Sequence, residues 1–229
     1  MPPITGTEPM AIIPLLLGHR GVRAERSIPE NSLASFDLAL AQGGDGFEFD
    51  VRLTADREAV ICHDATSGGR EIGVCSAEQL NLPSLREVLS RYHSTAFLDI
   101  ELKVAGLETI VVDSLHAFPP ARGFVGSSFL PAVLKAIHDL DSHMPLGLIC
   151  ETRAELSRWP ELPIEYVIPQ YQLLGPELFA QLKGAGKKIF VWTVNAPADM
   201  KWLSEWGVDG IISDNPKLLL SSLTGNKNN

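Results

Sequence analysis

The sequence predicts a single (β/α)8 TIM barrel, and three observations support this fold class. Eight short apolar runs alternate with amphipathic stretches along the chain, which is typical of parallel strands connected by helices. Eight such pairs are the number that a closed barrel requires, and 229 residues suffice for one domain of this kind. Chargeable residues follow several of the runs, at the strand ends where (β/α)8 barrels carry their active sites.

The expected strands are mainly apolar runs of four to seven residues. The first run ends at a Gly-His-Arg-Gly turn and begins the barrel. A further short run at 59–61 predicts an additional strand outside the count of eight. In chain order, the barrel strands are expected at 12–18, 46–51, 96–102, 123–127, 146–149, 165–169, 188–194 and 210–213.

The expected helices follow the strands and carry recognisable start and stop signals. Ser84 and Glu87 have the spacing of a capping box at the start of the second helix. Gly184 is expected to end the sixth helix, because glycine tolerates the left-handed conformation of a helix terminus. In chain order, the helices are expected at 32–41, 82–91, 107–117, 130–140, 152–159, 176–184, 197–206 and 216–223.

Two segments depart from this alternation. Residues 65–81 form a 17-residue stretch with little periodicity, and we predict an insertion loop or lid over the barrel mouth. The last five residues, Gly-Asn-Lys-Asn-Asn, contain no apolar side chain. The sequence therefore predicts one domain over residues 10–224, followed by a disordered tail at 225–229.

Composition limits the classes of partner. A net charge of −9 argues against nucleic-acid binding, which usually requires a basic face. The three cysteines are too few and too widely spaced for a disulfide framework or a zinc signature. The apolar run at 12–17 is too short to cross a membrane and lacks the flanks of a signal peptide. We expect a cytoplasmic protein without stable membrane anchoring, and the sequence leaves its oligomeric state open.

A pair of carboxylates on the second strand predicts a metal site. Strand alternation sends Glu48 and Asp50 to one side and the flanking phenylalanines to the other. Two carboxylates this close repel each other unless a cation lies between them, and oxygen ligands suit Mg²⁺ or Ca²⁺. On the third strand, Glu101 is placed to complete the site, and Lys103 is placed to meet a phosphate.

Two histidines at strand ends predict acid–base chemistry. His19 stands beside Arg20 in a turn bracketed by glycines, which offers a proton-transfer group next to a phosphate clamp. His63 follows the short run at 59–61, so the two histidines could divide the work of general base and general acid. At the end of the seventh strand, Trp192 is a candidate apolar wall for the substrate, and Asn195 is a candidate cap for the next helix.

Taken together, these motifs resemble the glycerophosphodiester phosphodiesterase family. They occur in the family's order and span nearly the whole chain. Each motif is weak alone, but their order is specific. The matching segments are 18–21, 30–32, 47–51, 63–64, 83–85, 100–103, 127–129, 192–195 and 207–216.

The resemblance implies a (β/α)8 barrel that hydrolyses glycerophosphodiesters, small molecules, to glycerol 3-phosphate and an alcohol. It also implies a divalent cation as cofactor, with Mg²⁺, Ca²⁺ and Mn²⁺ as candidates. The roles that it implies are metal binding by Glu48, Asp50 and Glu101, acid–base catalysis by His19 and His63, phosphate binding by Arg20 and Lys103, positioning by Glu30 with Asn31 beside the site, and a pocket wall from Trp192.

The sequence departs from the family's pattern in three places. The segment after His63 is shorter than the usual insertion, and Ser32 and Arg57 stand where the family more often has Thr and Gly. A smaller lid could admit bulkier alcohols, so lysophospholipase D-type activity on lipid phosphodiesters is an alternative. A Schiff-base lyase using Lys103 is a second alternative, although three nearby carboxylates favour a metal cage instead. A non-catalytic phosphate-binding barrel is a third, and the pair of histidines argues against it.

Overall fold

The computed structural model describes residues 13–225, and they form a closed (β/α)8 barrel. The barrel closes because β1 pairs in parallel with both β2 and β11. A ninth strand, β3, is added antiparallel to the far end of β2. The strands are β1 (Leu15–His19), β2 (Gly46–Leu53), β3 (Ala59–Ile61), β6 (Phe97–Leu102), β7 (Phe124–Ser128), β8 (Leu146–Cys150), β9 (Tyr166–Pro169), β10 (Lys188–Val191) and β11 (Gly210–Ser213).

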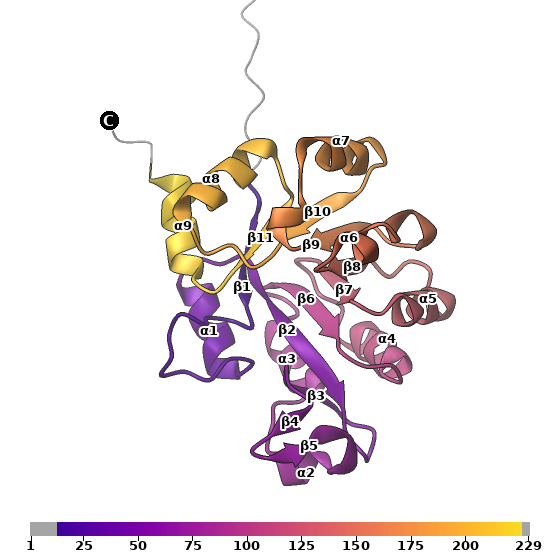
Figure 1. Cartoon of the computed structure of the whole chain (residues 1–229). Coiled ribbons are helices and arrows are strands. Elements are labelled where there is room, and N and C mark those ends of the chain that lie inside the picture. Colours follow the sequence, from indigo (N-terminus) through magenta and orange to yellow (C-terminus); the bar gives the residue numbers. More distant parts are fainter. Residues whose placement is uncertain (1–12, 226–229) are drawn as a thin grey trace, which may run out of the picture.

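The connecting helices surround the strands in a ring (Figure 1). Among residues 13–225, no helix combines the length and apolar content needed to cross a bilayer. The helices are α1 (Leu33–Ala41), α3 (Leu85–Tyr92), α4 (Glu108–Ala117), α5 (Pro131–Leu140), α6 (Arg153–Leu156), α7 (Pro176–Gly184), α8 (Pro197–Trp206) and α9 (Pro216–Thr224), with single 3₁₀ turns at η2 (Trp159–Glu161) and η3 (Tyr171–Leu173).

The eight predicted barrel strands and the additional strand are confirmed, with ends that shift by a few residues. The predicted helix at 152–159 is wrong in length, because α6 has only four residues and gives way to η2 at Trp159-Pro160. Proline cannot donate a backbone hydrogen bond, which favours this break. Gly184 is also not the left-handed residue after α7; Gly186 takes that conformation, with φ +70°. The predicted start at residue 10 and tail residues 226–229 lie outside the described residues.

The insertion at 65–81 contains regular secondary structure, although its sequence shows little periodicity. It contains a two-strand hairpin, β4 (Thr66–Ser67) with β5 (Arg70–Glu71), then η1 (Ile72–Val74) and α2 (Ala77–Leu80). These elements lie beyond β3, outside the ring of helices (Figure 1). None of the described residues 65–81 lines the main cavity, so the structure does not support the prediction of a lid.

Strand alternation divides the apolar core into two layers. The outward side chains of β2 pack on the helices, and Phe36 of α1 stacks on Phe47 with ring centroids 4.2 Å apart. Inside the barrel, an apolar layer includes Leu17, Phe97 and Phe190. The residues two positions further along the same strands reach the carboxyl end of the barrel. This layer therefore supports the polar residues above it, which include His19 and Asp99.

Candidate active site

The main cavity, of about 490 Å³, opens at the carboxyl ends of the strands. Acids, histidines and cations line the side near β1, β2 and β6. Apolar and aromatic side chains line the opposite side, together with Glu151 and Glu155. The lining residues are His19, Arg20, Glu48, His63, Asp99, Glu101, Lys103, Phe129, Ile149, Glu151, Glu155, Ile168, Trp192 and Ile212.

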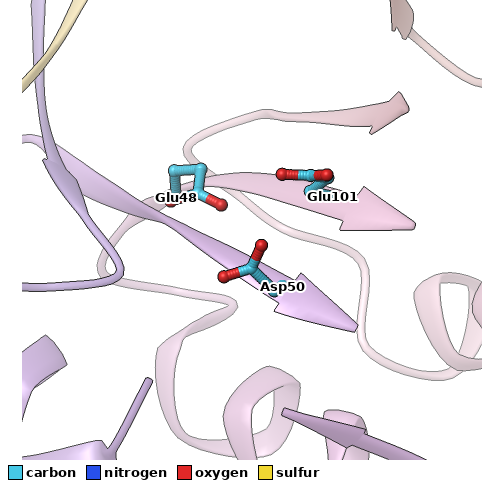
Figure 2. A group of neighbouring side chains, drawn as sticks. All are labelled: Glu48, Asp50 and Glu101. Carbon is cyan, nitrogen blue, oxygen red and sulfur yellow. The ribbon is translucent and has the colours of Figure 1, made fainter. Parts of the chain in front are cut away.

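Glu48, Asp50 and Glu101 converge as the sequence predicts. Asp50 lies directly opposite Glu101 in the register of β2 and β6. One oxygen from each of the three carboxylates lies within 4.8 Å of the others, and all three residues are buried. Figure 2 shows the three side chains facing a common space between the two strands.

The protonation of this cluster reflects burial and mutual repulsion. Burial, and next the charge of Asp50, raise the pKa of Glu48 well above its ordinary value. The same two causes raise the pKa of Glu101 to about 7, against the opposing effect of Lys103. Burial also acts to raise the pKa of Asp50, but Arg20 and Lys103 outweigh it and lower that pKa.

The donor set fits a hard divalent cation. Glu48 Oε1 is a buried oxygen without a hydrogen-bond partner in the described part of the chain, and Asp50 Oδ1 is contacted by the Lys103 ammonium at 3.3 Å without a well-formed hydrogen bond. Buried polar atoms are rarely left unpaired, so the free oxygen of Glu48 indicates that the cluster can accept a further cation. Carboxylate oxygens are the ligands that Mg²⁺ and Ca²⁺ prefer. The cluster can therefore hold such an ion, which would relieve the repulsion.

Arg20 and Lys103 lie beside the carboxylates as predicted. Arg20 Nε is 3.1 Å from Asp50 Oδ2, and Lys103 Nζ is 2.6 Å from Glu101 Oε1 and 3.3 Å from Asp50 Oδ1. Burial acts to lower the pKa of Lys103, but the two acids outweigh it and raise that pKa. Lys103 is thus held as an ammonium ion, which argues against its use as a Schiff-base nucleophile.

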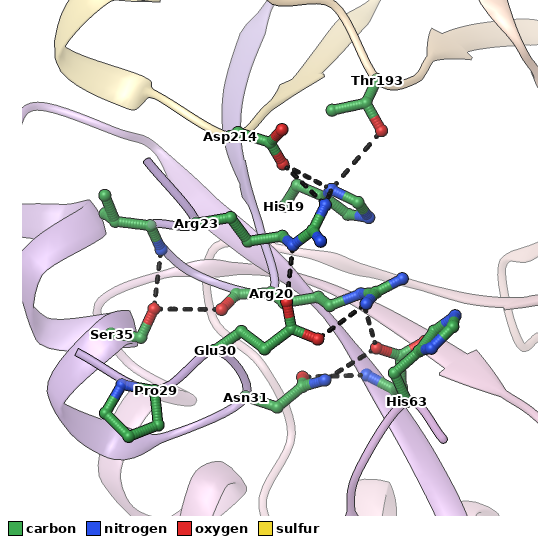
Figure 3. A network of polar contacts seen from close by, with 12 residues as sticks. His19, Arg20, Arg23, Pro29, Glu30, Asn31, Ser35, His63, Thr193 and Asp214 are labelled. Atoms are coloured by element: carbon green, nitrogen blue, oxygen red, sulfur yellow. Dashed lines mark hydrogen bonds and ion pairs between the residues drawn. The ribbon is translucent and has the colours of Figure 1, made fainter. Parts of the chain in front are cut away.

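His19 is held by a carboxylate that the sequence analysis gave no role. Its Nδ1 is 2.8 Å from Asp214 Oδ1 (Figure 3). Its Nε2 is 4.0 Å from Glu48 Oε2. Burial lowers the pKa of His19, and the hydrogen bond to Asp214 opposes that shift. Because Asp214 accepts a hydrogen bond from Nδ1, the neutral ring keeps its lone pair on Nε2, on the side of the metal cluster.

Asp214 is itself fixed by its neighbours. Asn195 Nδ2 donates to Asp214 Oδ2 at 2.7 Å, and the Asp214 backbone N–H donates to Asn195 Oδ1 at 3.0 Å. Asn195 is therefore not the predicted helix cap; Ala196 occupies the N-cap of α8, without a side-chain bond. Arg23 adds a positive charge, with Nη1 3.3 Å from Asp214 Oδ1.

His63 lies at the rim of the same cavity. Its side chain is 37% exposed, and its Nδ1 is 2.8 Å from Asp64 Oδ1. It lines the cavity together with His19, so both predicted histidines reach one space. Their environments differ, because the side chain of His19 is only 11% exposed.

The three predicted accessory residues contribute in different ways. Glu30 is not among the lining residues; its Oε1 accepts a hydrogen bond from Arg20 Nη1 at 2.7 Å. Asn31, with φ +55°, donates from Nδ2 to Asp50 Oδ2 at 2.8 Å. Trp192 lines the cavity as predicted, and its Nε1 donates to the backbone oxygen of Ile168 at 3.0 Å.

A fourth buried acid was not assigned a role from the sequence. Asp99 lines the cavity floor, next to Glu48 in the register of β2 and β6. Its Oδ1 accepts a hydrogen bond from Ser127, whereas its buried Oδ2 has no partner in the described residues. Burial raises the pKa of Asp99 to about 7. Its alternation with Glu101 on one strand was a signal in the sequence that could have identified it.

Comparisons with known proteins agree with this geometry. The model of the glycerophosphoryl diester phosphodiesterase family matches residues 19–112 and 101–218. A glycerophosphodiester phosphodiesterase of Caldanaerobacter subterraneus is 30% identical, over 90% of this chain and 96% of that protein. Another protein, from Bacillus subtilis and named a putative glycerophosphodiester phosphodiesterase, is 29% identical with the same coverage of both chains.

Solved structures show the same fold. A phosphodiesterase of Oleispira antarctica, in complex with its product sn-glycerol-3-phosphate, superimposes with a TM-score of 0.82 at 26% identity. The superposition covers 92% of this chain and 97% of that one. A glycerophosphodiester phosphodiesterase of Parabacteroides distasonis gives a TM-score of 0.81 at 26% identity, over 91% and 96% of the two chains.

Proposed function

This chain belongs to the glycerophosphoryl diester phosphodiesterase family, and from that premise we propose that it hydrolyses glycerophosphodiesters in a metal-dependent reaction. The products are glycerol 3-phosphate and an alcohol. The observation that carries the proposal is one cavity lined by two histidines, two cationic side chains and the carboxylates of Glu48 and Glu101, which form a buried cluster with Asp50. The product bound to the similar Oleispira antarctica enzyme supports a small phosphate ester as the occupant.

The phosphate of the diester is negatively charged and repels an incoming nucleophile. The site therefore requires positive charge beside the phosphate. Arg20 and Lys103 line the cavity and provide two cationic groups beside the carboxylate cluster. Glu48, Asp50 and Glu101 would hold a divalent cation, which would supply Lewis-acid chemistry when bound. Glu30 and Asn31 hold Arg20 and Asp50 in place by the hydrogen bonds described above.

Each exchange at the phosphorus requires two proton transfers, one at each histidine. His19 Nε2 takes the proton of the attacking hydroxyl, which belongs either to the substrate's glycerol or to water. As the new P–O bond forms, the P–O bond to the alcohol breaks, and His63 gives the departing oxygen its proton. Attack by water gives glycerol 3-phosphate directly. Attack by the glycerol hydroxyl gives a cyclic phosphodiester, which water opens to glycerol 3-phosphate in a second exchange with the roles of the two histidines reversed. Asp214 holds the Nδ1 proton of His19 throughout, so the ring presents the same nitrogen in each turnover.

A panel of diesters tests this function. Metal-free protein is mixed with a range of glycerophosphodiesters and lysolipids, with Mg²⁺, Ca²⁺ or Mn²⁺ added. Release of glycerol 3-phosphate is measured for the glycerophosphodiesters, and release of lysophosphatidate for the lysolipids. We expect metal-dependent release from glycerophosphodiesters, lost in His19→Ala. Cleavage of lysolipids alone would favour the lysophospholipase D-type alternative, and no hydrolysis in any combination would contradict the proposal.

A further inference from the structure

The side of the cavity opposite the metal cluster has a chemistry that hydrolysis itself does not require. Its deep wall is apolar, and Phe129 and Trp192 form its flanks. Two glutamates, Glu151 and Glu155, also line it. The lysine and the arginine that line the cavity, Lys103 and Arg20, both belong to the other side, so among described residues this side carries only negative charge.

Glu155 is a fixed anion in this wall. Its Oε2 accepts hydrogen bonds from the backbone N–H groups of Glu151 and Thr152, both at 2.9 Å, as part of the capping box of α6. These bonds, first the one from Glu151, lower the pKa of Glu155. Both backbone bonds are made to the same oxygen, Oε2, and they hold the carboxylate at the start of α6.

The aromatic pair of Phe129 and Trp192 lines the cavity as one contacting unit. Phe129 and Trp192 meet edge to face, with centroids 5.8 Å apart and planes at 89°. The hydrogen bond from Trp192 to Ile168 fixes the indole ring. Lys103 Nζ already lies 5.7 Å from the centroid of Phe129, so this ring accepts a cation from the phosphate side. Aromatic faces attract cations through the ring quadrupole, and quaternary ammonium groups are bound in this way.

Two buried oxygens show that the cavity is built for a polar occupant. Glu48 Oε1 and Asp99 Oδ2 lack hydrogen-bond partners among the described residues, and both residues line the cavity. Glu48 belongs to the cation cluster, where the phosphate binds in the reaction proposed above. One arm of the bound diester must then extend from that phosphate toward the opposite side.

We propose, on the basis of the function proposed above, that this opposite side binds the alcohol arm and selects alcohols that carry a positive charge. The alcohols of this class are aminoethanol and its quaternary trimethylammonium form. In both, the charged nitrogen lies two carbons from the ester oxygen. Glu151 and Glu155 attract the charged nitrogen, and Phe129 and Trp192 contact its alkyl groups. An anionic alcohol meets two carboxylates, and a polyol places its hydroxyls against the buried wall of Ile149, Ile168 and Ile212.

The test compares two substrates of one shape. Glycerophosphocholine carries the charge, and the 3,3-dimethylbutyl ester of glycerol 3-phosphate replaces its nitrogen by carbon. The kcat/KM ratio of the first to the second is measured for the wild type and for the Glu151→Gln, Glu155→Gln double variant. Gln also serves in a capping box, so Glu155→Gln keeps the start of α6. Glu161→Gln removes one charge from an exposed position outside the cavity and is the matched control.

We expect the wild type to prefer the charged substrate about tenfold and the double variant to lose that preference, as two electrostatic contacts of this kind allow. The Glu161→Gln control keeps the ratio, and added salt reduces it in the wild type. Equal kcat/KM values in the wild type, or a ratio that the double variant leaves unchanged, would overturn the inference while the hydrolase function stands. No cleavage of either substrate by the wild type would instead overturn the function and the inference together.

Discussion

His19 depends on one residue from the other end of the chain. Asp214 Oδ1 lies 2.8 Å from its Nδ1, and Asn195 in turn fixes Asp214. A carboxylate in this position selects one tautomer and one ring orientation, which leaves Nε2 available for proton transfer. Asp214 therefore acts as a positioning residue, since it contacts the histidine and lines no part of the cavity.

Replacing Asp214 by Asn tests this role. An amide can accept or donate at the same place and no longer enforces the tautomer, so we expect kcat to fall by about 10² to 10⁴-fold with a small change in KM. Asp139→Asn, at an exposed position of α5, is the control and should retain full kcat. A drop in the thermal midpoint that accounts for the lost activity, or an unchanged kcat, would contradict the positioning role.

The allocation of base and acid to the two histidines has its own test. An ester of glycerol 3-phosphate with p-nitrophenol has a leaving group that departs without a proton. We expect His63→Ala to lose about 10² to 10⁴-fold in kcat on a choline ester but less than about tenfold on the p-nitrophenyl ester. His19→Ala should lose activity on both. The opposite pattern would exchange the roles of the two histidines.

At the residue scale, sequence alternation was sufficient to predict the metal cluster but not the support of His19. Glu48 and Asp50 share one strand face, so a period of two places them together without knowledge of the fold. Asp214 reaches His19 only because the barrel closes β11 on β1. A contact across that closure joins residues 195 positions apart, and no local pattern encodes it.

At the scale of elements, the turn between β2 and β3 carries a conformational cost. Arg57 has φ +63°, and its backbone N–H donates to the Thr54 oxygen at 3.0 Å in a tight turn. The family more often has Gly here, and the left-handed backbone explains why glycine suits the position. A side chain with a Cβ is disfavoured in this conformation by about 1–2 kcal/mol.

Arg57→Gly should therefore stabilise the protein. Relief of the left-handed strain exceeds the extra entropy of glycine in the unfolded chain, so we expect a gain of roughly 0.5–1 kcal/mol in unfolding free energy. Urea unfolding at constant m-value measures it. Arg158→Gly should instead lower the free energy of unfolding. Arg158 has φ −84°, so glycine relieves no strain there and brings only its entropic cost. Equal losses in the two variants would contradict this interpretation.

Element types were predictable where local signals and burial agree. The capping box of Ser84 and Glu87 is present as expected, and the barrel strands follow their apolar runs. The insertion was not predictable, because its elements have two to four residues and show no periodicity at that length. The helix expected at 152–159 ended early for a local reason, the proline at position 160.

At the scale of the whole molecule, the buried acids couple stability to pH when no metal is bound. Asp99 and Glu101 have pKa values of about 7 in the folded chain, against ordinary values of 3.8 and 4.5. Between these values the folded chain binds more protons than the unfolded chain. The contribution of these two acids to the free energy of unfolding therefore falls as pH rises from about 4 to about 7, the reverse of the usual carboxylate effect. His19, whose pKa is lowered from 6.5, contributes in the opposite direction, but it is one group against two.

We expect protein kept free of metal by a chelator to have a thermal midpoint several degrees lower at pH 7.5 than at pH 5.5. This shift corresponds to a difference of about one to two kcal/mol in the free energy of unfolding. Below about pH 4, stability is lost again, because Asp50 and Asp214 have lowered pKa values and contribute through their charged forms. Adding Mg²⁺ or Mn²⁺ should raise the midpoint more at pH 7.5 than at pH 5.5. Chelated protein that becomes more stable between pH 5.5 and 7.5 would contradict the coupling.

The cation site of Glu48, Asp50 and Glu101 underlies both the reaction and this pH dependence, and one measurement tests it most directly. Crystals of the protein loaded with Mn²⁺ are measured for anomalous scattering at the manganese edge. We predict a single strong peak at the carboxyl ends of β2 and β6, about 2.0–2.6 Å from an oxygen of each of the three carboxylates. No peak between these side chains, or a peak elsewhere in the barrel alone, would contradict the site.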